Sequence, residues 1–219
     1  MHKPIQIVPA ILTDDPTALK SMVRQAETFA NRVQFDIMDG QFVPSRSITD
    51  RHIARLKTKL GWEAHLMVQH PEQYIAGFQQ AGAGRIIFHY EATTSPQEVI
   101  ALGRSLNIKV GLAVNPDTPV SKITPLADEV DCVLFMSVHP GFYGSAFIPE
   151  VLDKLTGFRL SYPDIEIGID GGINEHNIAR VAQAGVNSIY IGSAIFHKKR
   201  PGESYKRLVA LANKASVSL

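Results

Sequence analysis

Eight short apolar runs, each followed by a longer stretch with helical spacing of its apolar residues, constrain this fold more than any other feature of the sequence. The runs consist almost without interruption of Val, Ile, Leu, Phe and Met, as is typical of parallel strands covered on both faces. The predicted strands are Ile5–Leu12, Arg32–Met38, Glu63–Val68, Arg85–Tyr90, Lys109–Val114, Asp131–Ser137, Ile165–Asp170 and Ser188–Ile191. Strands and helices that alternate in this way predict an α/β protein.

The length of the chain favours a closed barrel over an open sheet. A complete (β/α)₈ barrel needs roughly 200 to 250 residues, and this chain has 219. An open doubly wound sheet is the alternative, but no Gly-x-Gly-x-x-Gly follows any predicted strand, so its dinucleotide-binding form lacks its fingerprint. We therefore predict a single (β/α)₈ TIM-barrel domain over residues 1–219.

Polar residues and prolines at the strand-to-helix joints predict where the helices begin. Thr13-Asp14-Asp15-Pro16 places capping side chains before a proline suited to the first helical turn. Asn115-Pro116-Asp117 and Asn174-Glu175 repeat this signal after later strands.

Composition excludes several classes of partner. The chain has 22 Lys and Arg against 21 Asp and Glu, so a broad nucleic-acid or membrane-surface footprint is not expected. The only basic run, Lys198–Arg200, is interpreted as a solvated loop. No run approaches the ~18 apolar residues of a membrane span, and no signal peptide is recognised, so we expect a cytoplasmic protein. The single Cys132 lies in an apolar run and is predicted to be a small buried hydrophobe.

Two aspartates stand where barrel enzymes place their reactive groups, at the carboxyl ends of strands. Asp36 lies near the end of the second predicted strand and Asp170 ends the seventh. In a closed barrel they would converge on the mouth, which suits a two-base proton transfer beside a carbonyl. The alternative is that each aspartate only caps the following turn. Asp36 argues against this, because a carboxylate inside an apolar run is costly unless it is paired or binds a metal.

His65 lies inside the third predicted strand, between Ala64 and Leu66. A lone core histidine is most often a hydrogen-bonded structural residue. Together with Asp36 and Asp170, however, it could hold a divalent metal, since histidine and aspartate are both metal ligands. Such a metal would stabilise the enediolate formed when a proton leaves the carbon beside a carbonyl.

Small residues follow the last three strands and predict a phosphate site. They are Gly141 and Gly144, Gly171 and Gly172, and Gly192 with Ser193. The loops after strands seven and eight, with a short extra helix, form the common phosphate site of barrels, and Gly192–Phe196 is predicted to be that helix. Backbone N–H groups can hold a phosphate without a lysine. The alternative is that these glycines only permit tight turns.

Two other chemistries lack their residues. No lysine stands at the carboxyl end of a predicted strand, so a Schiff-base aldolase would have no nucleophile. Ser137 and Cys132 have no evident His–Asp partners, so acyl transfer is unsupported.

The motifs together resemble the ribulose-phosphate 3-epimerase family. They are Asp36-x-Met-Asp-Gly-x-Phe-Val-Pro44, His65-Leu-Met-Val68, Asn115-Pro116-x-Thr-Pro119, Met136-Ser-Val-x-Pro-Gly-Phe142, Asp170-Gly-Gly172 and Gly192-Ser-Ala-Ile-Phe196. The resemblance implies inversion at C3 of a ketose phosphate, D-ribulose 5-phosphate to D-xylulose 5-phosphate, as in the pentose phosphate pathway. It implies Asp36 and Asp170 as the acid/base pair, with a divalent metal (Zn, Fe or Mn) at Asp36, His65 and Asp170. It also implies that Met38, Met67 and Met136 line the site, and that the protein is a homo-oligomer, a dimer or larger.

Several positions depart from the family pattern as the resemblance gives it. Gln34 stands where the family has a metal-ligating histidine, and an amide oxygen is a neutral, weaker zinc ligand than imidazole. Ala10 replaces a serine, Ser45 an asparagine, and Tyr143 and Ser145 alter the phosphate loop. We expect an active 3-epimerase. The alternatives are an epimerase for a tetrulose or hexulose phosphate, or a non-catalytic phosphosugar-binding protein.

Overall fold

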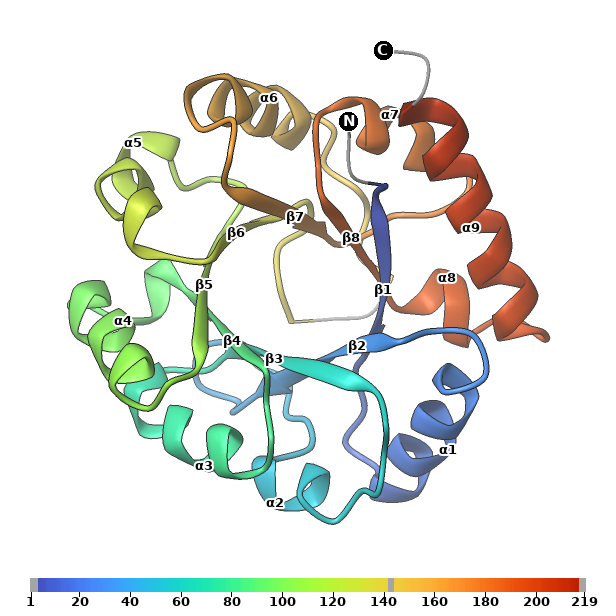
Figure 1. The fold of residues 1–219 in the computed structure, drawn as a ribbon, viewed down its shortest axis with the longest axis horizontal. Coiled ribbons are helices and arrows are strands. Elements are labelled where there is room, and N and C mark those ends of the chain that lie inside the picture. Colours follow the sequence, from blue (N-terminus) through green and yellow to red (C-terminus); the bar gives the residue numbers. More distant parts are fainter. Residues whose placement is uncertain (1–3, 142–143, 217–219) are drawn as a thin grey trace.

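Eight parallel strands close into a barrel in the computed structural model, which describes residues 4–141 and 144–216 (Figure 1). Neighbours in the sequence pair with one another, and β8 returns to β1. The strands are β1 Gln6–Ile11, β2 Arg32–Met38, β3 Gly61–Met67, β4 Arg85–His89, β5 Lys109–Val114, β6 Cys132–Met136, β7 Glu166–Asp170 and β8 Ser188–Ile191. The predicted (β/α)₈ architecture and all eight strands are confirmed, with ends that move by one or two residues at most.

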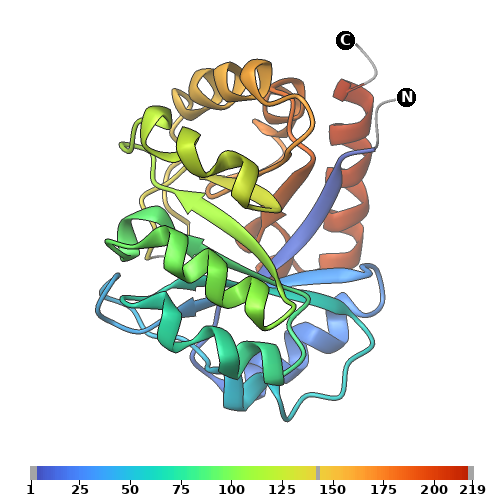
Figure 2. The same ribbon diagram turned by 60° about the vertical axis from the view of Figure 1, so that its left-hand side comes forward.

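Helices cover the outside of the barrel (Figures 1 and 2). The α-helices are α1 Pro16–Ala26, α2 Asp50–Ile53, α3 Ile75–Gln80, α4 Pro96–Ser105, α5 Val120–Ile123, α6 Val151–Ser161, α7 Ile178–Gln183, α8 Ser193–Phe196 and α9 Pro201–Ser216; short 3₁₀ helices are η1 Pro71–Gln73, η2 Tyr90–Ala92 and η3 Thr124–Glu129. The predicted short helix after β8 is confirmed as α8. Within the described residues, no helix combines the length and apolar character needed to cross a membrane.

Only one of the three polar strand-to-helix joints named above caps its helix directly. Asp15 caps α1 as predicted, accepting a hydrogen bond from the backbone N–H of Thr17 at 2.7 Å. The prediction at Asn115 was wrong, because α5 begins only at Val120. Residues preceding a proline avoid the helical region, and both Pro116 and Pro119 interrupt this segment. Near Asn174 the polar residues likewise form a turn first, and α7 begins at Ile178.

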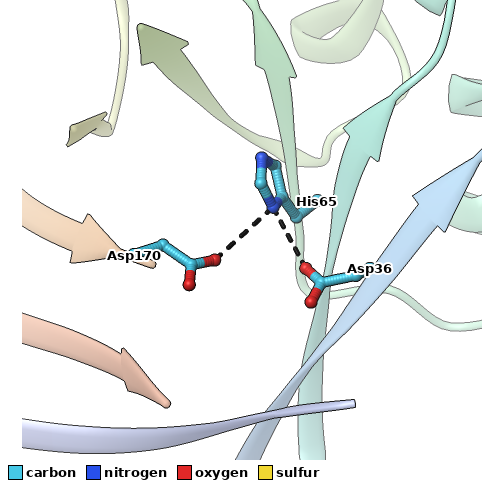
Figure 3. Close-up of side chains that lie close together, drawn as sticks. All are labelled: Asp36, His65 and Asp170. Atoms are coloured by element: carbon cyan, nitrogen blue, oxygen red, sulfur yellow. Dashed lines mark hydrogen bonds and ion pairs between the residues drawn. The ribbon is translucent and has the colours of Figure 1, made fainter. Parts of the chain in front are cut away.

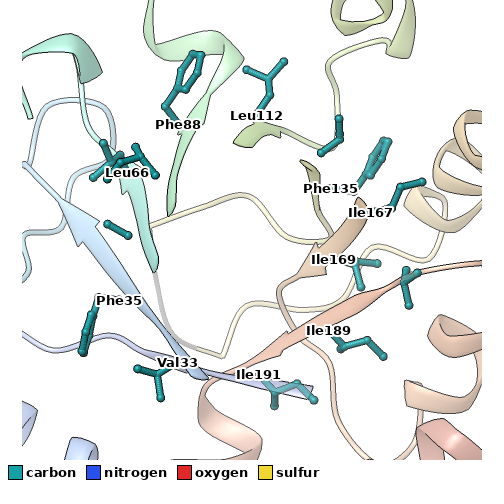
Figure 4. Packing of buried hydrophobic residues seen from close by; sticks show 14 of the residues in the cluster. Val33, Phe35, Leu66, Phe88, Leu112, Phe135, Ile167, Ile169, Ile189 and Ile191 are labelled. Carbon is teal, nitrogen blue, oxygen red and sulfur yellow. The ribbon is translucent and has the colours of Figure 1, made fainter. Parts of the chain in front are cut away.

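The apolar core has two large parts, and a small third cluster of Met38, Val43 and Met67 lies apart from them. Side chains such as Phe35, Leu66 and Phe88 point outward from the strands toward the helices (Figure 4). The barrel interior holds a second cluster, formed by Val8, Ala10, Ile87, Ala113, Cys132, Leu134, Met136, Val138 and Tyr190. Cys132 is buried as predicted, and burial raises the pKa of its thiol to about 12.

A polar network occupies the interior near the amino ends of the strands. Arg85 donates to Glu63 with its Nε at 2.9 Å, and its guanidinium also reaches Glu166 at 3.0 Å and the hydroxyl of Tyr190 at 3.0 Å. Arg85 and Glu63 are almost fully buried. Each buried charge therefore relies on the other, and the network ties together β3, β4, β7 and β8.

Substituting Arg85 by Met should lower the free energy of unfolding by about 3–5 kcal/mol, because Glu63 would be left buried without its partner. The double variant Arg85→Met/Glu63→Leu should be more stable than this single variant, since it buries no unpaired charge. Chemical denaturation followed by circular dichroism measures both. A loss below about 1 kcal/mol in Arg85→Met would contradict the pairing.

Candidate active site

Three ionisable side chains meet at the carboxyl ends of the strands (Figure 3). Asp36 lies on β2, and His65 occupies the position of β3 that pairs with Asp36. Asp170 is the last residue of β7. His65 Nδ1 lies 3.0 Å from Asp36 Oδ1 and 3.7 Å from Asp170 Oδ2. Barrel closure thus brings the two predicted aspartates and the predicted histidine together, although 134 positions separate Asp36 from Asp170 in the chain.

Gln34 bridges the two carboxylates from below. Its side-chain Nε2 donates to Asp36 Oδ1 at 3.0 Å and to Asp170 Oδ2 at 2.8 Å. Gln34 is fully buried. The residue predicted as a weak oxygen ligand therefore faces the site with its amide nitrogen in this structure.

The pKa of Asp170 is raised to about 7. Burial is the main cause and the charge of Asp36 adds to it, while His65 and the hydrogen bond from Gln34 act in the opposite direction. One carboxyl that is protonated near neutral pH beside another carboxylate provides an acid and a base in one site.

A second imidazole, His89, supports His65 from behind. His65 Nε2 lies 2.9 Å from His89 Nε2, and His89 Nδ1 faces Glu91 Oε2 at 3.4 Å. Burial, with the charge of His65, lowers the pKa of His89 to about 4 against the pull of Glu91, so His89 is neutral. A neutral His89 that carries its proton on Nδ1, toward Glu91, can accept a hydrogen bond from His65 Nε2–H. The pair then fixes the ring of His65 with Nδ1 toward the aspartates.

The neighbouring carboxylates favour the protonated form of His65. Burial alone would lower the pKa of His65, but the hydrogen bond and charge of Asp36, together with the charge of Asp170, raise it. A proton or a metal ion must occupy the line from Nδ1 to Asp36, because two acceptors cannot otherwise approach to 3.0 Å.

The donor atoms also fit a metal ion. His65 Nδ1 and one oxygen each from Asp36 and Asp170 lie within 4.8 Å of one another. Imidazole and carboxylate ligands suit divalent transition metals. These three residues could therefore hold one divalent cation, as the sequence predicted.

The pocket at this end of the barrel gathers the other predicted site residues. Besides Asp36, His65 and Asp170 it is lined by Met38, Met67, Met136, Gly141, Gly144, Gly171, Gly172, Gly192 and Ser193. Ala10 and Ser145 also line it, whereas Ser45 does not. Phe142 and Tyr143 lie outside the described residues. The methionines are buried and provide the apolar part of the wall.

The glycines after β7 are required by close backbone approach. Gly171 and Gly172 have φ of +116° and +63°, a region that L side chains rarely adopt. A Cβ on Gly172 would lie 2.8 Å from the backbone nitrogen of Phe147. The loops after β6 and β7 are therefore packed backbone to backbone at the pocket rim, which goes beyond what a tight turn alone requires.

Comparison with known proteins places the chain in a family. The model described as "Ribulose-phosphate 3 epimerase family" matches residues 6–196. The chain belongs to this family. Its relatives include the ribulose-phosphate 3-epimerase of Schizosaccharomyces pombe, 36% identical over 204 residues with 90% of each chain covered. The cytoplasmic isoform from Oryza sativa subsp. japonica is 37% identical over 205 residues, again with 90% of each chain covered.

Solved structures of lower identity share the fold. 3-Hexulose-6-phosphate synthase from Salmonella typhimurium has a TM-score of 0.74 at 13% identity, covering 96% of this chain and 100% of that one. KGPDC from Streptococcus mutans has a TM-score of 0.77 at 10% identity, covering 97% of this chain and 99% of that one. Together with the family match, this likeness identifies the fold as a TIM barrel of the ribulose-phosphate-binding type.

The raised pKa of Asp170 predicts how stability depends on pH in metal-free protein. The folded state holds a proton on Asp170 between about pH 4 and 7 that the unfolded state has released. The contribution of Asp170 to the free energy of unfolding should therefore fall as pH rises through this window, whereas that of His89, whose pKa is lowered to about 4, should rise. Asp170→Asn should therefore gain stability relative to the wild type as pH rises from about 4 to 7, measured by denaturant titration in the presence of a chelator.

The exposed substitution Asp14→Asn provides the control for loss of one charge. Its profile should run parallel to that of the wild type. If Asp170→Asn also runs parallel to the wild type between pH 4 and 7, Asp170 does not carry the extra proton.

Proposed function

We propose that the protein is an epimerase that inverts C3 of D-ribulose 5-phosphate to give D-xylulose 5-phosphate. The observation that carries the proposal is the facing pair of largely buried carboxylates, Asp36 and Asp170, one of which has a pKa of about 7. Family membership and relatives named ribulose-phosphate 3-epimerase support it.

In the proposed reaction, one carboxylate removes the proton from C3 beside the C2 carbonyl, and the other carboxyl delivers a proton to the opposite face. The electron pair left on C3 is held in the enediolate between the two steps. Asp170, protonated near neutral pH, suits the donor role, and Asp36 the base role, for one direction. The reverse direction exchanges these roles.

Asp36, His65 and Asp170 would hold the divalent cation of the family. When bound, the cation would stabilise negative charge on the enediolate oxygens. The Glu91–His89 pair keeps His65 Nδ1 turned toward the site. The buried methionines would exclude water from the intermediate.

In this proposal the phosphate of the substrate would lie at the loops after β6, β7 and β8. Gly172 and Ser193 lie on this side of the pocket, and the first backbone N–H groups of α8 have no partner within the helix. Asn174 and Asn177 donate to the Gly172 carbonyl at 3.2 and 3.0 Å and so fix the loop.

Incubation with D-ribulose 5-phosphate in D₂O tests the reaction. Deuterium should appear at C3 together with D-xylulose 5-phosphate, detected by NMR. Asp36→Asn and Asp170→Asn should each lower the rate by about 10²–10⁴-fold, because each removes one acid/base group. Asp14→Asn should match the wild type. Absence of deuterium at C3 in the wild type, with and without added Mn²⁺, Fe²⁺ or Zn²⁺, would refute the proposal.

Tetrulose and hexulose phosphates assayed in parallel separate the substrate alternatives. Faster turnover of one of these would reassign the substrate while keeping the chemistry. Binding of the phosphosugars without exchange would instead indicate a non-catalytic binding protein.

Substituting Gly172 by Ala tests the phosphate loops. The added Cβ would press on the backbone of Phe147 at a strained φ, so the loop must move. We expect KM to rise at least about tenfold, since a displacement of about 1 Å can cost 10²-fold. Gly157→Ala in α6, where nothing lies within 4 Å of the new Cβ, is the matched control. An unchanged KM in Gly172→Ala would contradict the assignment of the phosphate site to this loop.

A further inference from the structure

The side-chain amide of Gln34 is satisfied at one end only. Its nitrogen donates to Asp36 Oδ1 and Asp170 Oδ2. Its oxygen, Oε1, is buried and has no hydrogen-bond partner among the described residues. A buried acceptor without a partner costs free energy. The amide is therefore fixed mainly by its two hydrogen bonds to the carboxylates.

A half-turn of the amide would exchange its two ends within nearly the same volume. Oε1 would then occupy the position close to both Asp36 and Asp170. Once both carboxylates are ionised, three oxygens facing one another repel unless a cation lies between them. The presence of a cation should therefore decide which end of Gln34 faces the site.

We propose that Gln34 is a two-position side chain that tunes the site toward oxygen-preferring divalent cations of the Mn²⁺ class and away from Zn²⁺. Without metal, its nitrogen ties Asp36 to Asp170. With metal, its oxygen turns inward and becomes the fourth ligand. The inference rests on the proposed function, which places a divalent cation at Asp36, His65 and Asp170.

The selectivity follows from the donor set. The four ligands would be oxygens from Asp36, Asp170 and Gln34 and one imidazole nitrogen from His65. Carboxylate and carbonyl oxygens suit Mn²⁺ and Mg²⁺, whereas imidazole favours Zn²⁺. A site with a single imidazole should discriminate less in favour of Zn²⁺ than one with two. The two hydrogen bonds that must break also lower the affinity for every cation.

Metal titration tests the inference without any activity measurement. Chelator-treated protein is titrated with Mn²⁺, followed by the electron paramagnetic resonance signal of the free ion, and with Zn²⁺ in competition with a chromophoric chelator. Gln34→His should raise Zn²⁺ affinity by about tenfold or more relative to Mn²⁺, as ligand-sphere changes typically shift affinity 10–100-fold. Gln97→Met, on the exposed face of α4, should match the wild type.

The substitution Gln34→Met tests whether Gln34 ligates the cation or only occupies the carboxylates through its hydrogen bonds. Met has a similar length but neither donates a hydrogen bond nor offers an oxygen. If Gln34 ligates the cation, Mn²⁺ affinity should fall by about tenfold. If the nitrogen always stays inward, removing it frees the carboxylates, and unchanged or increased Mn²⁺ affinity would overturn the inference.

A measurement on the wild type covers the case in which Gln34→Met does not fold. The ¹⁵N-labelled side-chain amide of Gln34, assigned by its absence in Gln34→His, should shift when diamagnetic Mg²⁺ or Zn²⁺ is added, as its two hydrogen bonds break. A bound cation with an unchanged amide signal would refute the turn. Metal binding that depends on Gln34, without deuterium exchange at C3, would refute the proposed function only.

Discussion

Mutual repulsion between two largely buried carboxylates is the constraint around which the upper half of this barrel is built. Asp36 and Asp170 point at one another where water is largely excluded, and such a pair is stable only if its charge is compensated. Three means of compensation are present. They are a shared proton, reflected in the pKa of Asp170 near 7, the raised pKa of His65, and the two N–H groups of Gln34. A divalent cation would provide a fourth.

The barrel separates this pair from a second set of buried charges. The Arg85 network lies near the amino ends of the strands, and the interior also holds an apolar cluster that includes Ile87, Ala113 and Leu134. In the Arg85 network the charges form ion pairs that join the strands. At the carboxyl ends, Asp36 and Asp170 face one histidine, His65, so the charges are less completely matched. The same closed sheet thus holds both sets of charges, one at each end of the strands.

The sequence predicts the barrel and much of the site because both depend on local signals. Apolar runs mark the strands, and Asp36 and Asp170 stand at strand ends, where closure of the barrel determines that they converge. His89 also stands at a strand end, that of β4, and Glu91 follows it, but neither was singled out, because a histidine at a strand end does not reveal its partner. Their role appears only when β3 and β4 pair and bring His89 to 2.9 Å from His65. Likewise, no sequence pattern tells which end of the Gln34 amide faces the aspartates.

The contrast between His65 and Gln34 shows why membership of the family does not by itself determine the metal. His65 is held from behind by His89, so its Nδ1 is oriented toward the site before any ligand arrives. Gln34 has no such support, since its oxygen meets no partner among the described residues. In the proposed metal site, His65 is a preorganised ligand. Gln34 would have to turn its amide and break its two hydrogen bonds to Asp36 and Asp170. Gln34 would therefore set the affinity of this proposed site for a cation, and its orientation would also determine how strongly the carboxylates of Asp36 and Asp170 repel.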